Sequence, residues 1–351
     1  MSRCSGDLKP ALGYHRAMTA EGHRPAKRRS LARRLGIIAL AVVLVLSAGG
    51  VALWIWKPWA PEMRVAEPAA SGEWVRADGV LGHWYPAEDA DDGPGVLLVS
   101  GSEGGLQPRL VAQATALQAE GFSVLALAYF GAEGQSDALV DIPLETFDAG
   151  IDWLARQPEV DPERIGMVGG SKGAEAALLM ASRRDRLAAV VANVPSHVVW
   201  QGLDLVRPWR MGTDPRSSWS DRGQPLPYAS LASGALPPET LTEIYQQALD
   251  AGVPPASRID IDAIEAPVLL TCGGRDTVWP SCPMAEEIAA AASDKQHLTV
   301  LDYPDAGHFV QGPPGDLDPA QIESGGGTAQ ANAAARAQAW PQLVAFLKRS
   351  L

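Results

Sequence analysis

The five residues 169–173, Gly-Gly-Ser-Lys-Gly, constrain the fold of this chain more than any other stretch. An apolar run at 164–168, typical of a buried strand, precedes them, and a helix-forming run at 174–181 follows. A tight strand-to-helix turn strains its central residue and needs small neighbours, which glycine supplies. The pattern predicts that the Ser171 hydroxyl projects above a sheet, close to the unpaired first amides of the helix. The alternative is a glycine-rich turn with an idle serine.

Apolar runs and helix-forming segments alternate along most of the chain. The expected strands lie at 95–99, 122–128, 164–168, 188–192, 268–272 and 298–301. The expected helices lie at 107–119, 144–156, 174–181, 283–292 and 331–348. Pro341 is expected to kink or restart the last helix, and Asp78-Gly79 between two alternating runs predicts a β-hairpin. This order predicts an α/β fold with a mostly parallel sheet and helices on both faces.

Two segments interrupt the alternation. Residues 196–260 are rich in Pro, Trp, Arg and Ser and contain one expected helix at 238–250. We predict that they form a cap insertion. Residues 312–328 are rich in Gly and Pro and are expected to form a loop.

The N-terminal segment differs in composition from the rest. Residues 1–35 end in a basic cluster and are expected to form a disordered cytoplasmic tail. Residues 36–56 carry no charge and, at about 1.5 Å per residue, are long enough to cross a membrane. Because the basic cluster comes first, a signal anchor would place the domain at 72–351 outside the cytoplasm, after a Pro- and Ala-rich linker at 57–71. The alternative is a signal peptide cleaved near residues 47–49.

Charge is divided unevenly along the chain. Residues 1–60 contain ten Lys and Arg against two Asp and Glu, and the remaining residues contain 19 against 39, a net charge of −20. A domain this acidic repels nucleic acid, so we expect no nucleic-acid partner. No Cys-x-x-Cys or His-Glu-x-x-His pattern occurs, and we expect neither a metal nor a cofactor.

A serine hydroxyl becomes a good nucleophile when a base takes its proton and an acid orients that base. Asp276 and His308 each follow an expected strand, so both fall at the sheet edge that carries Ser171. The sequence therefore predicts a catalytic triad of Ser171, His308 and Asp276. The alternatives are a turn aspartate and a surface histidine. Asp302 and Asp305 are less favoured as the acid, since each is very near His308 in sequence.

Backbone amides near the serine are the expected donors to a developing oxyanion. One is the amide of Lys172. The second is the amide of Ser102 or Glu103, in the glycine-rich loop that follows the expected strand at 95–99.

Other residues are candidates for the walls of a substrate pocket. His197 follows the end of an expected strand. Arg207 and Arg210 lie in the insertion and would bind phosphate groups of a charged substrate. The alternative is that these arginines form a solvated surface paired with nearby aspartates.

Cys272 and Cys282 lie on either side of Asp276 in the sequence. A disulfide between them, formed in an oxidising compartment, would hold the acid in place. We expect instead that both are reduced, buried side chains.

Several stretches together resemble the C-terminal catalytic domain of acyl-CoA thioesterases and bile acid-CoA:amino acid N-acyltransferases. They are 122–129, 169–174, 224–227, 303–308 and the last helix around Ala339-Trp340. The resemblance implies an α/β-hydrolase fold, with the nucleophile at Ser171, the acid at Asp276 and the base at His308. The N-acyltransferases of the family use cysteine as nucleophile, so a serine resembles the hydrolytic members and implies water as the acceptor. A membrane segment stands where the family has an immunoglobulin-like domain.

The sequence thus predicts a membrane-tethered serine hydrolase that cleaves a small-molecule carboxylic ester or thioester through an acyl-enzyme. A dienelactone-hydrolase-like esterase or a peptidase on the same fold is the second enzymatic interpretation. The non-enzymatic interpretation is a catalytically silent, membrane-tethered binding domain.

Overall fold

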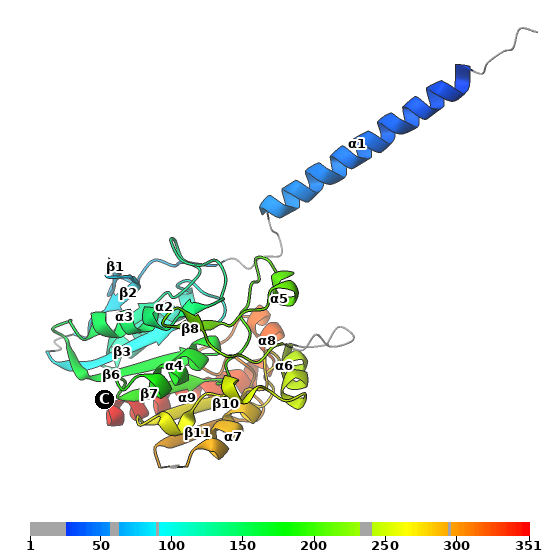
Figure 1. The fold of residues 1–351 in the computed structure, drawn as a ribbon. Helices are drawn as coiled ribbons and strands as arrows, with labels where there is room; N and C mark the ends of the chain where they lie inside the picture. Colours follow the sequence, from blue (N-terminus) through cyan, green and yellow to red (C-terminus); the bar gives the residue numbers. More distant parts are fainter. Residues whose placement is uncertain (1–25, 57–62, 89–90, 232–240, 294–295) are drawn as a thin grey trace, which may run out of the picture. The chain divides into compact units, whose positions relative to one another are not determined.

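A computed structural model describes residues 26–56, 63–88, 91–231, 241–293 and 296–351 (Figure 1). The chain divides into two compact units, Met1–Pro58 and Trp59–Leu351, and each is described by itself. Most of the predicted tail, residues 57–62 of the predicted linker and residues 238–240 of the predicted insertion helix lie outside the described residues.

The first unit contains one long helix, α1, Ala26–Trp56. Its segment Arg33–Trp56 is 24 residues long and apolar enough, with a hydropathy of 2.6, to cross a membrane. A signal sequence has the same properties. The helix begins ten residues before the predicted span at 36–56, because the basic residues ahead of the apolar run are themselves good helix formers.

Within the described part of the second unit, eight strands form one sheet in the order β1-β2-β4-β3-β6-β7-β10-β11. Their bounds are Glu73–Ala77 (β1), Val80–Tyr85 (β2), Gly93–Val99 (β3), Ser123–Leu127 (β4), Val160–Gly170 (β6), Ala189–Asn193 (β7), Val268–Gly273 (β10) and Leu298–Tyr303 (β11). Strands β1 and β2 are antiparallel, and β2 pairs antiparallel with β4. The other pairs are parallel, as predicted. The hairpin turn is at Asp78-Gly79, where both residues have positive φ.

Helices cover both faces of the sheet (Figure 1). Alternate residues of β3 divide between two cores: Leu97 and Val99 belong to one, Val96 and Leu98 to the other. The first core contains side chains of α3 (Glu145–Leu154), α4 (Lys172–Arg183) and α7 (Ser281–Ala291). The second contains side chains of α2 (Pro108–Ala119) and α9 (Ala329–Ser350). Burial on both faces explains the continuously apolar strands.

The insertion at 196–260 packs against the domain through its own small elements. They are α5 (Arg210–Thr213), β8 (Trp219–Asp221), β9 (Gln224–Pro225), α6 (Leu241–Asp250) and the 3₁₀ turn Pro255–Ser257. Strand β8 pairs with β5 (Ile142–Pro143) of the domain in a second, three-stranded sheet. Trp200 and Tyr245 of the insertion pack with Trp279, so the segment shares a core with the loop that carries Asp276.

One sequence expectation is wrong, and two others gain detail. The loop predicted at 312–328 contains a helix, α8 (Pro319–Gly325), with a capping box formed by Asp318 and Gln321. Helix α9 runs continuously through Pro341 without restarting, because its buried face packs on both sides of that residue. The predicted linker is partly folded: Val65 forms a bridge with Leu106.

The glycine at the start of α4 allows the helix to approach the sheet. A Cβ at Gly173 would overlap the backbone oxygen of Ser100 at the end of β3. We expect Gly173→Ala to lower the free energy of unfolding by about 1–3 kcal/mol, because the clash is with backbone. Thermal unfolding of the full chain in detergent would measure this.

Gly212→Ala is the matched control, since that glycine lies in α5 with open space around its Cβ position. Equal stability of the Gly173→Ala protein and the wild type would contradict the close packing.

Candidate active site

Ser171 lies at the turn between β6 and α4 with φ 55° and ψ −120°. This left-handed conformation is unfavourable for a serine and is typical of functional turns. Its amide donates to the Asn193 carbonyl (2.9 Å), and its own carbonyl accepts from the amides of Ala174 and Glu175 (2.9 and 3.1 Å). The surrounding backbone thus holds the turn in place.

His308 and Asp276 are hydrogen-bonded through His308 Nδ1 and Asp276 Oδ2 at 2.8 Å. Both side chains are almost fully buried. The other carboxylate oxygen accepts from the amides of Val278 (2.8 Å) and Trp279 (3.2 Å). A carboxylate at Nδ1 orients the ring so that Nε2 is the nitrogen available for chemistry. Asp302, a less favoured candidate acid, contacts the two cysteine sulfurs instead.

Three consecutive glycines, Gly325 to Gly327, join the loops of the acid and the base. The Gly325 carbonyl accepts from the amides of His308 (2.7 Å) and Thr277 (3.3 Å). The next two glycines form bridges with Asp276 and Ala306. Side chains on these glycines would collide with the two loops, so the segment fits only as glycine. Sequence reasoning missed this role, although the Asp-Pro-x-Gln capping pattern of α8 was available as a signal.

Ser171 and His308 line the same cavity, of about 710 Å³. Ser102 and Glu103, the predicted sources of an oxyanion donor, line it as well. A Cβ at Gly101 would lie 3.1 Å from Ser171 Cβ, so the loop after β3 lies directly against the serine. The first turn of α4, with the amide of Lys172, begins at the same point.

The Lys172 side chain is buried beneath the turn. Its ammonium group bonds to Glu175 Oε2 (2.9 Å) and Ser218 Oγ (2.8 Å). Glu175 Oε1 accepts from the Trp200 amide (3.0 Å) and from Trp219 Nε1 (2.7 Å). Burial lowers the pKa of Lys172 and raises that of Glu175, while their mutual attraction opposes both shifts. This buried pair ties the serine's helix to three residues of the insertion.

The predicted substrate-binding residues lie away from this cavity. His197 is buried, and burial together with the charge of Arg258 lowers its pKa to about 4. Arg207 pairs with the buried Asp204 (2.8 Å) and with the exposed Asp137 (2.5 Å).

Arg207 and Arg210 both line a separate cavity in the insertion. Of the residues of the insertion, Leu205 lines the cavity beside Ser171.

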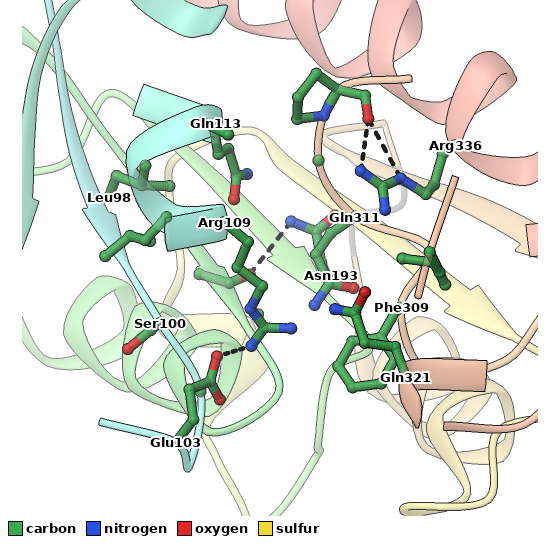
Figure 2. A pocket seen from close by; sticks show the side chains of 18 of the residues that line it. Leu98, Ser100, Glu103, Arg109, Gln113, Asn193, Phe309, Gln311, Gln321 and Arg336 are labelled. Carbon is green, nitrogen blue, oxygen red and sulfur yellow. Dashed lines mark hydrogen bonds and ion pairs between the residues drawn. The ribbon is translucent and has the colours of Figure 1, made fainter. Parts of the chain in front are cut away.

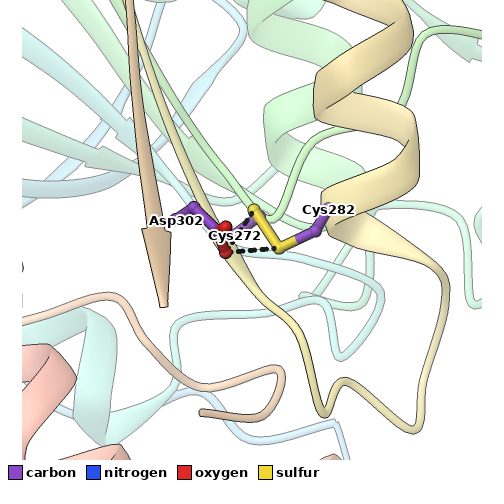
Figure 3. Close-up of side chains that lie close together, drawn as sticks. All are labelled: Cys272, Cys282 and Asp302. Atoms are coloured by element: carbon purple, nitrogen blue, oxygen red, sulfur yellow. Dashed lines mark hydrogen bonds between the residues drawn. A yellow bond between two sulfur atoms is a disulfide. The ribbon is translucent and has the colours of Figure 1, made fainter. Parts of the chain in front are cut away.

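Cys272 and Cys282 are joined by a disulfide (Figure 3). The expectation that both are reduced is therefore wrong: β10 and α7 bring their Cα atoms to 5.0 Å, a separation that sequence does not show. Asp302 Oδ1 lies 3.8 and 3.3 Å from the two sulfurs. These three side chains are close enough to share a metal ion, but a disulfide offers no thiolate ligand. The bond closes the loop that carries Asp276.

The buried pair beneath Ser171 leads to a stability prediction. We expect Lys172→Met to lower the free energy of unfolding by about 3–5 kcal/mol, because Glu175 is left as an unpaired buried charge. The double variant Lys172→Met/Glu175→Gln should lose less, because a neutral amide oxygen can still accept from Trp200 and Trp219. Denaturant unfolding of the full chain measures both.

Lys348→Met is the control, since Lys348 and Glu120 form an exposed pair (2.7 Å) that should contribute about 0–1 kcal/mol. A single variant as stable as the wild type, or a double variant less stable than the single one, would contradict the prediction.

Solved structures share this fold. A Mycobacterium tuberculosis puromycin-hydrolyzing peptidase aligns with a TM-score of 0.52 at 18% identity, over 80% of this chain and 40% of that one. The 2,6-dihydroxy-pseudo-oxynicotine hydrolase aligns with a TM-score of 0.50 at 15% identity, over 81% and 68% of the two chains. Along the eight-stranded sheet the strands run 1-2-4-3-5-6-7-8 in chain order. The second unit therefore has the hydrolase fold that was predicted.

Sequence comparison identifies the family. Human acyl-coenzyme A thioesterase 1 is 28% identical over 300 residues, which cover 81% of this chain and 66% of that protein. Mouse mitochondrial acyl-coenzyme A thioesterase 2 is 28% identical over 270 residues, covering 74% and 55%. The chain thus spans less than two thirds of the length of these relatives. The family model described as BAAT / Acyl-CoA thioester hydrolase C terminal matches residues 142–351, more than half of the chain. The chain belongs to this family.

Proposed function

We propose that this protein is a serine hydrolase that cleaves a thioester or a carboxylic ester through an acyl-enzyme on Ser171. The observation that carries the proposal is that the strained Ser171 lines one cavity with His308. The Nδ1 atom of that histidine is hydrogen-bonded to Asp276. Family membership and the names of the thioesterase relatives favour a thioester.

The proposed chemistry follows from these positions. Ser171 Oγ attacks the acyl carbon while His308 Nε2 takes its proton. The amides of Lys172 and of Ser102 or Glu103 stabilise the oxyanion. His308 returns the proton to the leaving thiolate or alkoxide as that bond breaks. Water, deprotonated by His308, then cleaves the acyl-enzyme and regenerates the serine.

Asp276 is the positioning carboxylate. It keeps the proton of His308 on Nδ1 and stabilises the imidazolium that forms in each half of the reaction. The amides of Val278 and Trp279 donate to the other carboxylate oxygen and so hold the carboxylate in place.

We expect Ser171→Ala to lower kcat/KM for a butyryl thioester by about 10³-fold or more, because the acyl-enzyme cannot form. Labelling by a fluorophosphonate probe should disappear with it. Release of thiol and probe fluorescence are the two measurements.

Ser182→Ala is the control on the same helix, where the hydroxyl donates to the Leu179 carbonyl (3.1 Å) and lines neither the cavity nor the turn. A wild-type protein that neither takes the label nor hydrolyses any ester would be a silent binding domain, and the proposal would fail.

We also propose that α1 anchors the protein, with its N-terminus in the cytoplasm and the domain outside. Its length and hydropathy, the basic residues that precede the apolar run, and the disulfide in the domain support this orientation.

The three cysteines report this topology in one experiment. A membrane-impermeant maleimide should label no cysteine in intact cells, because Cys4 is inside and the other two are bonded. Unfolding in detergent should expose one thiol, and reduction should expose three.

Cys4→Ser is the control and should show no thiol before reduction. Labelling of Cys4 in intact cells would show that the N-terminus is outside, which contradicts the proposed orientation. Three thiols without reduction would exclude the disulfide. A wild-type chain with no thiol before reduction would indicate a cleaved signal peptide.

A further inference from the structure

Exposed large apolar side chains of the second unit gather around the cavity beside Ser171. In the described part of that unit, five such side chains are exposed: Val65, Leu205, Trp209, Leu241 and Val300. Single exposed apolar side chains are normal on a protein surface, so their position is more informative than their number. The first four lie at or beside residues that line this cavity, and we call these four the apolar rim.

Two members of the apolar rim belong to the insertion. Leu205 lines the cavity itself, and Trp209, 50% exposed, lies immediately before α5. The Arg207 amide donates to Asp204 Oδ1 (2.8 Å), and the Arg210 amide donates to the Arg207 carbonyl (2.9 Å). The chain from 204 to 210 is therefore tightly turned, which keeps Trp209 close to Leu205.

The other two members lie beside the loops of the site. Val65 directly follows Arg64, which lines the cavity. Leu241, 55% exposed, directly precedes Thr242, whose hydroxyl donates to the Asp276 carbonyl (2.9 Å). Segments far apart in the sequence thus each place an exposed apolar side chain near the same cavity.

The cavity opens to the surface between these side chains. Of its lining residues, Arg64, Pro108, Asp318 and Ser324 are exposed. One of these carries a positive charge and one a negative charge, so the opening does not select a partner by the sign of its charge. The apolar rim is what distinguishes it from the rest of the surface.

The inner end of the cavity differs from its opening. Phe309 and Gln311 also line a smaller cavity of about 170 Å³, whose lining mixes apolar side chains with two arginines and two carboxylates. Figure 2 shows the guanidinium groups of Arg109 and Arg336 on either side of Gln311. Apart from Leu205, the members of the apolar rim line neither cavity, so only another surface would remove them from water.

The tether indicates what that surface is. With α1 in the membrane as proposed, residues 57–62 join it to Met63. A chain of this length reaches at most about 25 Å, whereas a domain of this size is roughly 45–50 Å across. The side of the domain opposite Met63 therefore cannot face the membrane. Arg64, the next residue, lines the cavity, so the tether keeps the opening near the lipid surface.

Apolar burial is the interaction that this surface can make. The domain carries a net charge of −20, so electrostatic attraction to anionic lipids does not drive docking. Trp and Leu side chains are suited to the interfacial layer of a membrane. Because a tether makes docking an intramolecular event with a high effective concentration, a few such side chains are sufficient.

We propose that the apolar rim docks on the phospholipid surface of the membrane that α1 spans. The cavity beside Ser171 then opens into the lipid and takes an ester or thioester already dissolved there. This inference rests on the proposed anchor and, for its substrate, on the proposed hydrolase function.

The test places a lipid-sensitive probe beside the apolar rim. The full chain with Cys4→Ser and Gly212→Cys is labelled with the fluorophore NBD, without reduction so that the disulfide stays closed, and inserted into phosphatidylcholine nanodiscs. Gly212 lies in α5, three residues after Trp209, with open space around its Cβ position. We expect lipid that carries a doxyl nitroxide to quench this probe several-fold more than a probe at Val300→Cys, since Val300 is exposed on β11, away from the cavity.

Variants show whether the apolar rim causes the quenching. The double variant Trp209→Ser/Leu241→Ser, which keeps the lining of the cavity, should abolish the excess quenching at position 212. Val300→Ser is the matched control, because it removes an exposed apolar side chain outside the apolar rim and should leave the quenching unchanged.

Activity gives a second measurement. The ratio compared is kcat/KM for p-nitrophenyl dodecanoate dissolved in the nanodiscs over kcat/KM for p-nitrophenyl acetate in water. Loss of two apolar side chains from the lipid contact should lower this ratio by about tenfold in the double variant. Val300→Ser should leave it unchanged.

The outcomes separate this inference from the proposed function. Equal quenching at positions 212 and 300, or unchanged quenching in a folded double variant, overturns the docking even when the protein hydrolyses both esters. Quenching at position 212 that depends on the apolar rim, in a protein that takes no fluorophosphonate label and cleaves no ester, supports the docking and removes the hydrolase function.

Discussion

The close approach of α4 to the sheet at Ser171 is the constraint on which the candidate site depends. Gly169 and Gly173 pack against each other, and Gly173 lies against the end of β3. A side chain at either position would separate strand and helix. The turn between them holds Ser171 at a positive φ, so the hydroxyl and the first amides of α4 are presented at one edge of the sheet. The positions of the other site residues matter only relative to this turn.

Long-range contacts bring the acid and the base to that edge. His308 and Asp276 lie in separate loops, and the glycine segment Gly325–Gly327 at the end of α8 pairs with both through its backbone. The disulfide closes the loop that carries Asp276 on its other side. A shift of either loop would change the geometry of the hydrogen bond between His308 and Asp276. Backbone contacts thus hold the two loops together, and Trp279 packs beside His308 as well.

Charged side chains divide into two kinds in this domain. Lys172 and Glu175 are fully buried and connect α4, the helix that follows Ser171, to the insertion at 196–260. Arg207 is itself partly exposed and pairs with the buried Asp204 and the exposed Asp137, away from the cavity beside Ser171. Arg109 and Arg336 face a cavity with unsatisfied polar groups. Their surroundings, not their charge, distinguish these roles.

The sequence by itself determined those features of the structure that depend on residues close together in the chain. The Gly-x-Ser-x-Gly turn, the Asp-Gly hairpin, the apolar strands and the chain order of Ser171, Asp276 and His308 were all readable, because strand and helix signals repeat over a few residues. Tertiary structure alone decided which distant residues meet. It buried Lys172, bonded Cys272 to Cys282, turned His197 and Arg207 away from the cavity and placed Arg336 beside Arg109. The physical reason is that burial and contact depend on how strands and helices far apart in the chain pack together, which no local pattern records.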